Sequence, residues 1–486
     1  MVKLQAKNAI MWFRQDLRVR DNPALVAASK CNQIFPLYIF DDKNAGDASP
    51  GAASKMWLYH SLKDLNNQLE GKLRFLIGDP KILLPKLVID NNIESIFWNR
   101  SYEQWQINRD TSIKTDLTNK GYFVESFNGS LLWEPWQVMK KDGTPYKVFT
   151  PFYRKGCLNA KAPRVPLNAP DLIIAQKDKL CGLDKLNELN LLPKTSWDEK
   201  VIGNWKVGER AAHSRLDEFL EGGLAGYKNG RNYPIKDNVS RLSTHIHWGE
   251  ISVNTIWQKC KFHINRKQVN EIDADQFFAE LGWREFSYSL LYNFPKLPSK
   301  NLQERFDNFV WSKNAIHLNL WKEGKTGYPI VDAGMRQLWQ TGYMHNRLRM
   351  IVGSFLVKNL LIDWRDGEKW FWETLVDADL ASNSAGWQWI AGCGADAAPY
   401  FRIFNPVTQG EKFDPDGKFI KKYVPELSSL PGKYLFRPWE APEEVLNSAG
   451  IKLGEDYPVP IVDLKKSREK ALAAFAKLKE TRSLKI

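Results

Sequence analysis

The first 132 residues alternate short apolar runs with helix-like segments, and this alternation restricts the possible folds more than any other feature of the chain. Helix-like patterns at Ala52–Leu69 and Pro80–Asn91 separate the apolar runs. Strands that alternate with helices in this way are typical of a parallel sheet wrapped by helices. The runs predicted as strands are Ala9–Phe13, Gln33–Phe40, Leu73–Ile77, Ser95–Trp98 and Tyr122–Ser126.

The chain is too long for one hydrophobic core, because 486 residues exceed what a single domain normally holds. We expect an N-terminal α/β domain with a Rossmann-like parallel sheet at residues 1–132 and a Pro-, Lys- and Asn-rich surface connector at residues 133–207. Residues 208–486 are expected to form a larger all-α domain. Its predicted helical segments include Glu209–Glu221, Ser252–His263, Ala274–Tyr292, Ile330–Gln340, Met344–Trp364 and Lys369–Leu375.

The charge balance favours a polyanionic partner. Lys and Arg number 69 against 56 Asp and Glu, a net charge of +13, although an ordinary solvated surface would give the same excess. No stretch approaches the roughly 18 uncharged apolar residues of a membrane span, and the N-terminus is unlike a secretory signal. The five scattered cysteines predict reduced thiols, with neither disulfides nor a metal site.

Two nucleotide-binding motifs are absent. The first predicted strand is followed by Arg14–Arg18, where a dinucleotide-binding fold would have a glycine-rich turn. Gly324–Thr326 looks like the end of a phosphate loop, but Asn319 stands where that loop requires glycine. The dinucleotide-binding fingerprint is therefore absent after the first predicted strand, and the second segment argues against an ATPase.

Candidate site residues are concentrated in two parts of the helical region. Glu280, Trp283 and Arg284 have the i, i+3, i+4 spacing of one helix face. A carboxyl, an indole and a guanidinium on one face suit a flipped-out base, but a core tryptophan beside a surface ion pair would look the same. The second group lies between Thr341 and Trp389 and comprises Asn346, Arg347, Arg349, Asp377, Asp379, Asn383, Trp387 and Trp389.

The last two tryptophans of this group are expected to have different neighbours. Trp387 and Trp389 are two residues apart, which is about 200° around a helix axis. Asn383 alone would be interpreted as a helix cap within Ala381–Ser384.

Six motifs in a fixed order closely resemble the photolyase/cryptochrome family. The resemblance covers essentially the whole chain, and within the family it is strongest to class I cyclobutane pyrimidine dimer photolyases. It implies a flavin enzyme that uses blue light to split pyrimidine dimers in DNA. The motifs are Met11–Arg18, Ser240–Ser243, Glu280–Phe286, Glu323–Pro329, Met344–Met350 and Gly386–Trp389.

The resemblance implies specific substrate contacts. Glu280 matches the carboxyl that bonds the dimer, Trp283 and Trp389 match residues that pack against it, and Arg284 is a further candidate. Arg347 is expected near the lesion phosphate. Asn346 and Met350 stand where enzymes specific for (6-4) photoproducts carry histidines, so this chain resembles a cyclobutane-dimer enzyme.

It also implies how FAD is held. Asn383 matches the amide that faces flavin N5, and Arg349, Asp377 and Asp379 match residues along the flavin ring. The diphosphate is expected at Ser240, Arg241, Leu242 and Ser243, and Tyr227 matches a further contact. Trp387, Trp364 and Trp311 match an electron-transfer chain.

The antenna chromophore is left open by the resemblance. Trp105 and Gln106 replace an Asn-Glu pair of folate-binding members, and Ser299 replaces a lysine of those members. His247 stands where deazaflavin-binding members have a lysine. Neither a folate nor a deazaflavin is therefore indicated.

The expected activity is a deoxyribodipyrimidine photo-lyase reaction, in which excited reduced FAD gives an electron to a flipped-out dimer in UV-damaged DNA. The alternative is a cryptochrome-type photoreceptor that signals through a protein partner. Asn383 argues against that alternative, because plant cryptochromes typically have an aspartate there. A damage-binding protein without repair activity is a third possibility. We expect a cytoplasmic monomer without a metal ion.

Overall fold

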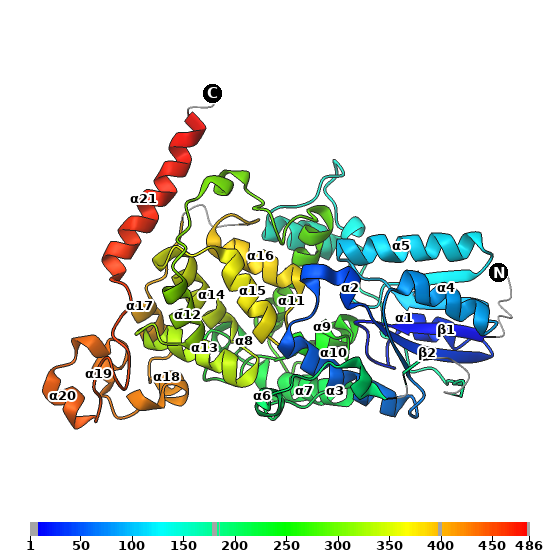
Figure 1. Cartoon of the computed structure of the whole chain (residues 1–486), viewed down its shortest axis with the longest axis horizontal. Coiled ribbons are helices and arrows are strands. Elements are labelled where there is room, and N and C mark those ends of the chain that lie inside the picture. Colours follow the sequence, from blue (N-terminus) through cyan, green and yellow to red (C-terminus); the bar gives the residue numbers. More distant parts are fainter. Residues whose placement is uncertain (1–7, 177–181, 184, 397–400, 484–486) are drawn as a thin grey trace. The chain divides into compact units, whose positions relative to one another are not determined.

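The computed structural model describes residues 8–176, 182–183, 185–396 and 401–483, with side chains described as far as residue 478 (Figure 1). Its contacts divide the chain into two compact units. Unit 1 comprises Met1–Ala225, Ser240–Pro295 and Val376–Ala381. Unit 2 comprises Gly226–Val239, Lys296–Leu375 and Ser382–Ile486.

Unit 1 contains a five-stranded parallel sheet in the order β3-β2-β1-β4-β5. The α/β prediction is confirmed, and each predicted strand agrees with the structure to within one residue at either end. This accuracy follows from the buried apolar runs themselves, which are bounded by polar turns. The strands are β1 (Asn8–Phe13), β2 (Gln33–Phe40), β3 (Arg74–Ile77), β4 (Ser95–Asn99) and β5 (Phe123–Phe127).

Helices cover both faces of this sheet, because alternate residues of each strand point to opposite sides. Met11 of β1 belongs to one core together with residues of α1 (Pro23–Ala28) and α3 (Ala52–Gln68). Trp12 belongs to the other core, with residues of α4 (Pro80–Asp90) and α5 (Gln104–Asn119). Both faces of the sheet are therefore buried, as is usual for parallel sheets.

The predicted connector is partly a buried element of unit 1. The π-helix η3 (Pro151–Gly156) buries Phe152 and Tyr153, which are 1% and 2% exposed. The sequence did not indicate these buried side chains, because the aromatic residues of this segment have no regular period that would reveal a buried face. Other short elements of the connector are η2 (Pro135–Gln137), η4 (Cys157–Asn159), η6 (Leu186–Leu189) and α6 (Trp197–Ile202).

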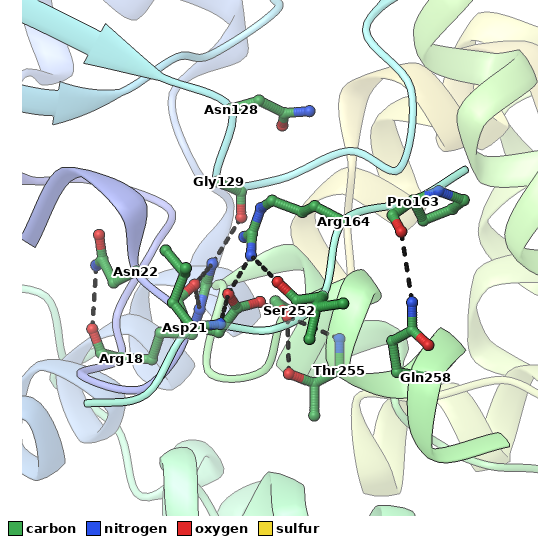
Figure 2. Close-up of polar contacts among 12 residues, drawn as sticks. Arg18, Asp21, Asn22, Asn128, Gly129, Pro163, Arg164, Ser252, Thr255 and Gln258 are labelled. Atoms are coloured by element: carbon green, nitrogen blue, oxygen red, sulfur yellow. Dashed lines mark hydrogen bonds and ion pairs between the residues drawn. The ribbon is translucent and has the colours of Figure 1, made fainter. Parts of the chain in front are cut away.

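Asp21 fastens the connector to the rest of unit 1 (Figure 2). Its carboxylate pairs with Arg164 of the connector and accepts the hydroxyl of Ser252. The backbone N–H of Leu167 also donates to Asp21, at 2.8 Å. Arg18 donates to the carbonyl of Gly129 at 2.7 Å. A single buried carboxylate thus joins three stretches of chain.

Unit 1 also contains the helices α7 (Glu209–Glu218), α9 (Ser243–His247), α10 (Val253–Asn265) and α11 (Glu271–Asn293). Three of them, α7, α10 and α11, overlap predicted segments, with ends that differ by up to three residues, whereas α9 was not among those segments. Asn270 caps α11, because its side chain accepts the backbone N–H of Asp273 at 2.8 Å.

Unit 2 is predominantly helical, which confirms the second part of the fold prediction. In its core, Asp332 of α13 (Pro329–Thr341) is fully buried and accepts both the N–H and the hydroxyl of Thr326. Tyr457 donates to the same carboxylate at 2.6 Å. Gly324 ends α12 (Ala315–Glu323) with a φ of 64°. The Gly324–Thr326 segment therefore serves a helix end and a buried carboxylate, which agrees with its exclusion as a phosphate loop.

The single helix predicted at Met344–Trp364 was wrong. The structure has α14 (Asn346–Ser354), the π-helix η9 (Phe355–Asn359) and then a break. Leu361 has a φ of 55°, which ends the helix, and Asp363 caps the next helix by accepting the N–H of Arg365. That next helix is α15 (Trp364–Thr374), which begins earlier than the predicted Lys369–Leu375.

Unit 2 also contains the α-helices α8 (Tyr227–Gly230), α17 (Pro406–Phe413), α18 (Lys418–Tyr423), α19 (Gly432–Leu435) and α21 (Leu464–Ser483). Helix α16 runs from Leu380 to Ala391.

Cys31, Cys157, Cys260 and Cys393 are buried free thiols, and Cys181 lies outside the described residues. Within the described part of the chain, no helix is long and apolar enough to cross a membrane. No group of three or more His, Cys, Asp or Glu side chains in that same part is arranged to hold a metal ion.

Candidate active site

Helix α11 of unit 1 carries the three residues that the sequence predicts on one face. Glu280 accepts a hydrogen bond from Gln276, one turn earlier, at 2.9 Å. Arg284 donates to the carbonyl of Ser130 at 3.0 Å and pairs with Glu285 at 3.1 Å. These bonds give Arg284 a structural role within unit 1, while Glu280 and Trp283 are only partly buried.

The indole of Trp283 is stacked on a phenyl ring from the connector. Phe149 lies parallel to it, with ring centroids 3.8 Å apart and an interplanar angle of 9°. Tyr153 lies parallel to Phe149 at 5.6 Å, and Phe286 meets the indole edge-on at 5.8 Å. Sequence reasoning missed Phe149, because one aromatic residue in an irregular segment gives no periodic signal.

Asp379 is a buried anion of unit 1. Tyr288 donates to its Oδ2 at 2.5 Å, and His247 Nδ1 lies 3.4 Å from the same oxygen. Burial alone would raise the pKa of Asp379, but His247, the charge of Arg284 and the Tyr288 hydroxyl together hold this pKa well below its usual value. Asp377, two residues earlier, is also buried.

In two other carboxyls of unit 1, Glu285 and Glu103, the pKa is raised and not lowered. Burial raises the pKa of Glu285 to about 7, although the N–H groups of Leu132 and Trp133 donate to it at 2.9 and 3.1 Å. Burial also raises the pKa of Glu103 to about 7, although Trp105 donates to it at 2.6 Å. Neighbouring carboxyls of opposite protonation preference are typical of functional sites.

The Ser240–Ser243 segment leads into α9, whose first residue is Ser243. Arg241 has a φ of 53°, and the N–H of Leu242 lies 3.4 Å from the hydroxyl of Ser240. Arg215 donates to the carbonyl of Ser240 at 2.9 Å and so fixes this turn. Among the described residues, no side chain caps the start of α9, so its first N–H groups suit an anionic ligand.

In unit 2, Arg347 contacts Met350 of its own helix and two residues that are distant along the chain, Asn232 and Phe413. Its guanidinium donates to the side-chain oxygen of Asn232, lies 4.2 Å from the ring centroid of Phe413 and is 3.8 Å from the sulfur of Met350. Burial and the nearby charge of Arg231 lower its pKa. Asn232 and Phe413 were not found from the sequence, since they are far from Arg347 along the chain.

Other predicted site residues of unit 2 have contacts different from those of Arg347. Asn346 begins α14 and is exposed, whereas Met350, one turn later, is partly buried. Arg349 donates to the carbonyl of Met344 at 2.8 Å. Tyr227 begins α8, is buried, and has the guanidinium of Arg231 5.6 Å from its ring.

Asn383 lies inside the first turn of α16, because this helix begins at Leu380. The interpretation of Asn383 as a helix cap is therefore wrong. Its Nδ2 donates to the backbone carbonyl of Glu368 at 3.0 Å, and the neighbouring Ser384 hydroxyl donates to the Glu368 carboxyl. Burial raises the pKa of Glu368 to about 7.

Trp387 is buried in the core of unit 2, whereas Trp389 is partly exposed, as expected from their angular separation. The Trp387 ring lies 5.0 Å from Phe371 and 6.3 Å from Trp321. Its Nε1 is buried and has no hydrogen-bond partner among the described residues.

A backbone hydrogen bond joins the segment that carries Trp311 to the segment that leads to Trp364. Trp364 is fully buried and donates to Asn301 at 3.0 Å. Ser312, next to Trp311, donates its N–H to the carbonyl of Leu361 at 2.6 Å, only three residues before Trp364.

The four residues that the sequence compares with antenna-binding positions, Trp105, Gln106, His247 and Ser299, contact other parts of the protein or are buried in it. Trp105 donates to Glu103, Gln106 is buried in α5, and His247 lies against Asp379. Ser299 donates to the carbonyl of Lys296 at 3.3 Å. These contacts favour neither a folate nor a deazaflavin.

Comparison with known proteins gives consistent results over the whole chain. The family model for DNA photolyase matches residues 9–171, and the model for the FAD binding domain of DNA photolyase matches residues 277–477. A deoxyribodipyrimidine photo-lyase of Agrobacterium fabrum is 46% identical, over 99% of this chain and all of that protein. Cryptochrome-2 of Arabidopsis thaliana is 35% identical, over 98% of this chain and 79% of that protein.

A solved structure also matches this chain over nearly its whole length. The crystal structure of a bacterial class III photolyase from Agrobacterium tumefaciens has a TM-score of 0.93 and 46% identity, and the match covers 98% of each chain. The sequence motifs were compared above with class I enzymes, whereas this similar protein is described as class III.

Proposed function

The chain belongs to the photolyase/cryptochrome family, and we propose that it is a light-driven lyase that splits cyclobutane pyrimidine dimers in UV-damaged DNA. The observation that carries this proposal is the 46% identity to a deoxyribodipyrimidine photo-lyase over essentially the full length of both proteins. The excess of 69 basic over 56 acidic residues supports a polyanionic substrate.

FAD is the cofactor. Bound in its reduced form, it supplies the light-driven electron, which returns after the dimer opens, so the reaction has no net redox change. In unit 1, we assign its diphosphate to Ser240–Ser243 and its ring to Asp377 and Asp379. The uncapped start of α9 and the anionic state of Asp379 support these assignments. In unit 2, we assign Tyr227, Arg349 and Asn383 to the cofactor.

Candidate contacts with the dimer are assigned in each unit by itself. In unit 1, Glu280 and Trp283 on α11 supply a carboxyl and a stacking surface, and Arg284 ties the middle of α11 to the carbonyl of Ser130. In unit 2, we assign Asn346, Met350 and Trp389 to the dimer. Arg347 is assigned to a lesion phosphate, because a guanidinium whose position is fixed by its neighbours loses little freedom on binding.

Trp387, Trp364 and Trp311 are proposed to carry electrons to oxidised flavin. The buried positions of Trp387 and Trp364 and the backbone link between Trp311 and Leu361 support this order. We further propose that the protein acts as a monomer in the cytoplasm.

The deciding experiment is illumination of the purified, reduced protein with blue light in the presence of single-stranded oligothymidine that contains one cyclobutane dimer. Recovery of thymine absorbance in the light but not in the dark is the expected result. With FAD demonstrably bound and reduced, a failure to recover this absorbance would favour the cryptochrome-type photoreceptor, and the search would turn to a protein partner.

A further inference from the structure

One face of the Trp283 indole is already occupied within the protein. The phenyl ring of Phe149 lies 3.8 Å from it at an interplanar angle of 9°, which is a face-to-face contact. Phe286 meets the indole at 72° and covers one edge. Since Trp283 is only partly buried, the area left for a ligand is on the face turned away from Phe149.

Phe149 is itself held in place. It is 8% exposed and lies parallel to Tyr153, at 5.6 Å and 5°. Tyr153 in turn packs closely on α11 at Gly282, where a Cβ atom would lie 2.6 Å from the ring. The absence of a side chain at Gly282 therefore permits the close approach of the ring that supports Phe149.

The connector is also tied to α11 beside these rings. Arg154 of η3 pairs with Asp275 of α11, with Nη1 3.0 Å from Oδ1. This ion pair is about half exposed, so it contributes little energy but fixes the register of η3 against α11. A π-helix is itself uncommon and frequently accompanies a functional site.

We infer that Phe149 is a substrate-positioning residue. Its ring fixes the plane of the Trp283 indole and closes one face of it, so that the pyrimidine dimer can stack only on the opposite face. Because stacking of the dimer on Trp283 belongs to the function proposed above, Phe149 acts on the substrate through Trp283 and not by contact with it. Aromatic pairs of this kind stabilise a fixed geometry beyond the area that they bury.

The test compares Phe149→Leu with Phe149→Tyr in the FAD-loaded protein. We expect Phe149→Leu to bind dimer-containing oligothymidine about three- to tenfold more weakly in the dark, and Phe149→Tyr to bind it nearly as well as the unmodified protein. Photoreduction of the flavin is expected to be the same in all three proteins, since Phe149 belongs to the stacking surface only.

Phe152→Leu is the matched control. Phe152 of η3 is also buried, but its ring packs on Phe286 at 5.1 Å and on Tyr146. The Phe152→Leu variant should lower the urea midpoint of unfolding at least as much as Phe149→Leu does, and it should leave the affinity for the dimer unchanged. Equal weakening of binding by Phe149→Leu and Phe152→Leu would overturn the inference, and so would unchanged binding by a folded Phe149→Leu protein.

The two failures can be told apart. If the unmodified protein binds and repairs dimers but Phe149→Leu does the same, only the role of Phe149 is refuted. If the unmodified protein neither binds nor repairs them, the proposed function itself fails.

Discussion

Replacement of Gly367 by alanine tests the packing around Trp387 directly. Gly367 lies on α15 against the Trp387 indole, and an added Cβ would be 2.2 Å from Cη2 and 2.5 Å from Cζ3. It would also lie 2.7 Å from a methyl carbon of Leu356. Carbon atoms in contact are normally about 3.5 Å apart, so the indole or the helix must move by roughly 1.3 Å.

The indole has little room for this movement. Trp387 is 2% exposed, and Phe371 lies 5.0 Å from it. On the α14 side, even the Cβ position of Gly353 is 3.5 Å from its Cζ3 atom. Overpacking costs about 1–3 kcal/mol, and alanine in place of glycine in a helix recovers about 1 kcal/mol. The net expectation is a loss of up to about 2 kcal/mol in the free energy of unfolding.

The assay is urea unfolding of the FAD-loaded protein, together with the rate of flavin photoreduction. Gly367→Ala should lower the urea midpoint without a change in slope, and should slow photoreduction because Trp387 is displaced. Gly432→Ala is the control, because Gly432 begins α19 and no atom lies within 4 Å of its added Cβ. If both variants unfold and photoreduce alike, the close contact with Trp387 has no energetic consequence and the reasoning is refuted.

Three further results are expected. Glu280→Ala should lower the quantum yield of repair more than it weakens dimer binding in a titration, and a collapse of binding alone would remove the role given to this carboxyl. Trp387→Phe should slow photoreduction of oxidised flavin but spare repair by chemically reduced enzyme, so unchanged photoreduction would exclude Trp387 from the electron chain. Burial raises the pKa of Glu368 from 4.5 to about 7. Between these two pH values the native protein binds more protons than the unfolded chain, so the free energy of unfolding falls as the pH rises from 4.5 to about 7. Glu368→Gln should reduce that fall between about pH 5 and about pH 7.5 in urea titrations, compared with Glu443→Gln at an exposed position.

The α/β part could be predicted well because its strands are local features. Gln33–Phe40 was predicted at its observed bounds, since eight consecutive residues pair within the sheet and all but the first are buried. Met344–Trp364 failed because its break depends on one backbone angle. Leu361 has a φ of 55°, which the side chain of leucine does not signal, and its carbonyl accepts the N–H of Ser312 from a distant segment.

Site residues found by motif and residues found by structure differ in one physical respect. Glu280, Trp283 and Arg284 are close in sequence, so their spacing alone places them on a common helix face. His247 and Asp379 are 132 positions apart, and Phe149 meets Trp283 across a similar span. Only the folded chain brings such pairs together, and no periodic pattern records them.

Helix α11 shows why these distant partners matter for catalysis. It is 23 residues long and carries Glu280, which accepts a hydrogen bond from Gln276, and Trp283, which stacks on Phe149. The helix is fixed elsewhere along its length: Arg284 binds Ser130, Glu285 accepts two backbone N–H groups, and Asp275 pairs with Arg154. A stacking surface must be held within a fraction of an ångström to act on a flat substrate. The buried contacts behind α11 and the ring of Phe149 therefore determine the position of the residues proposed to meet the dimer.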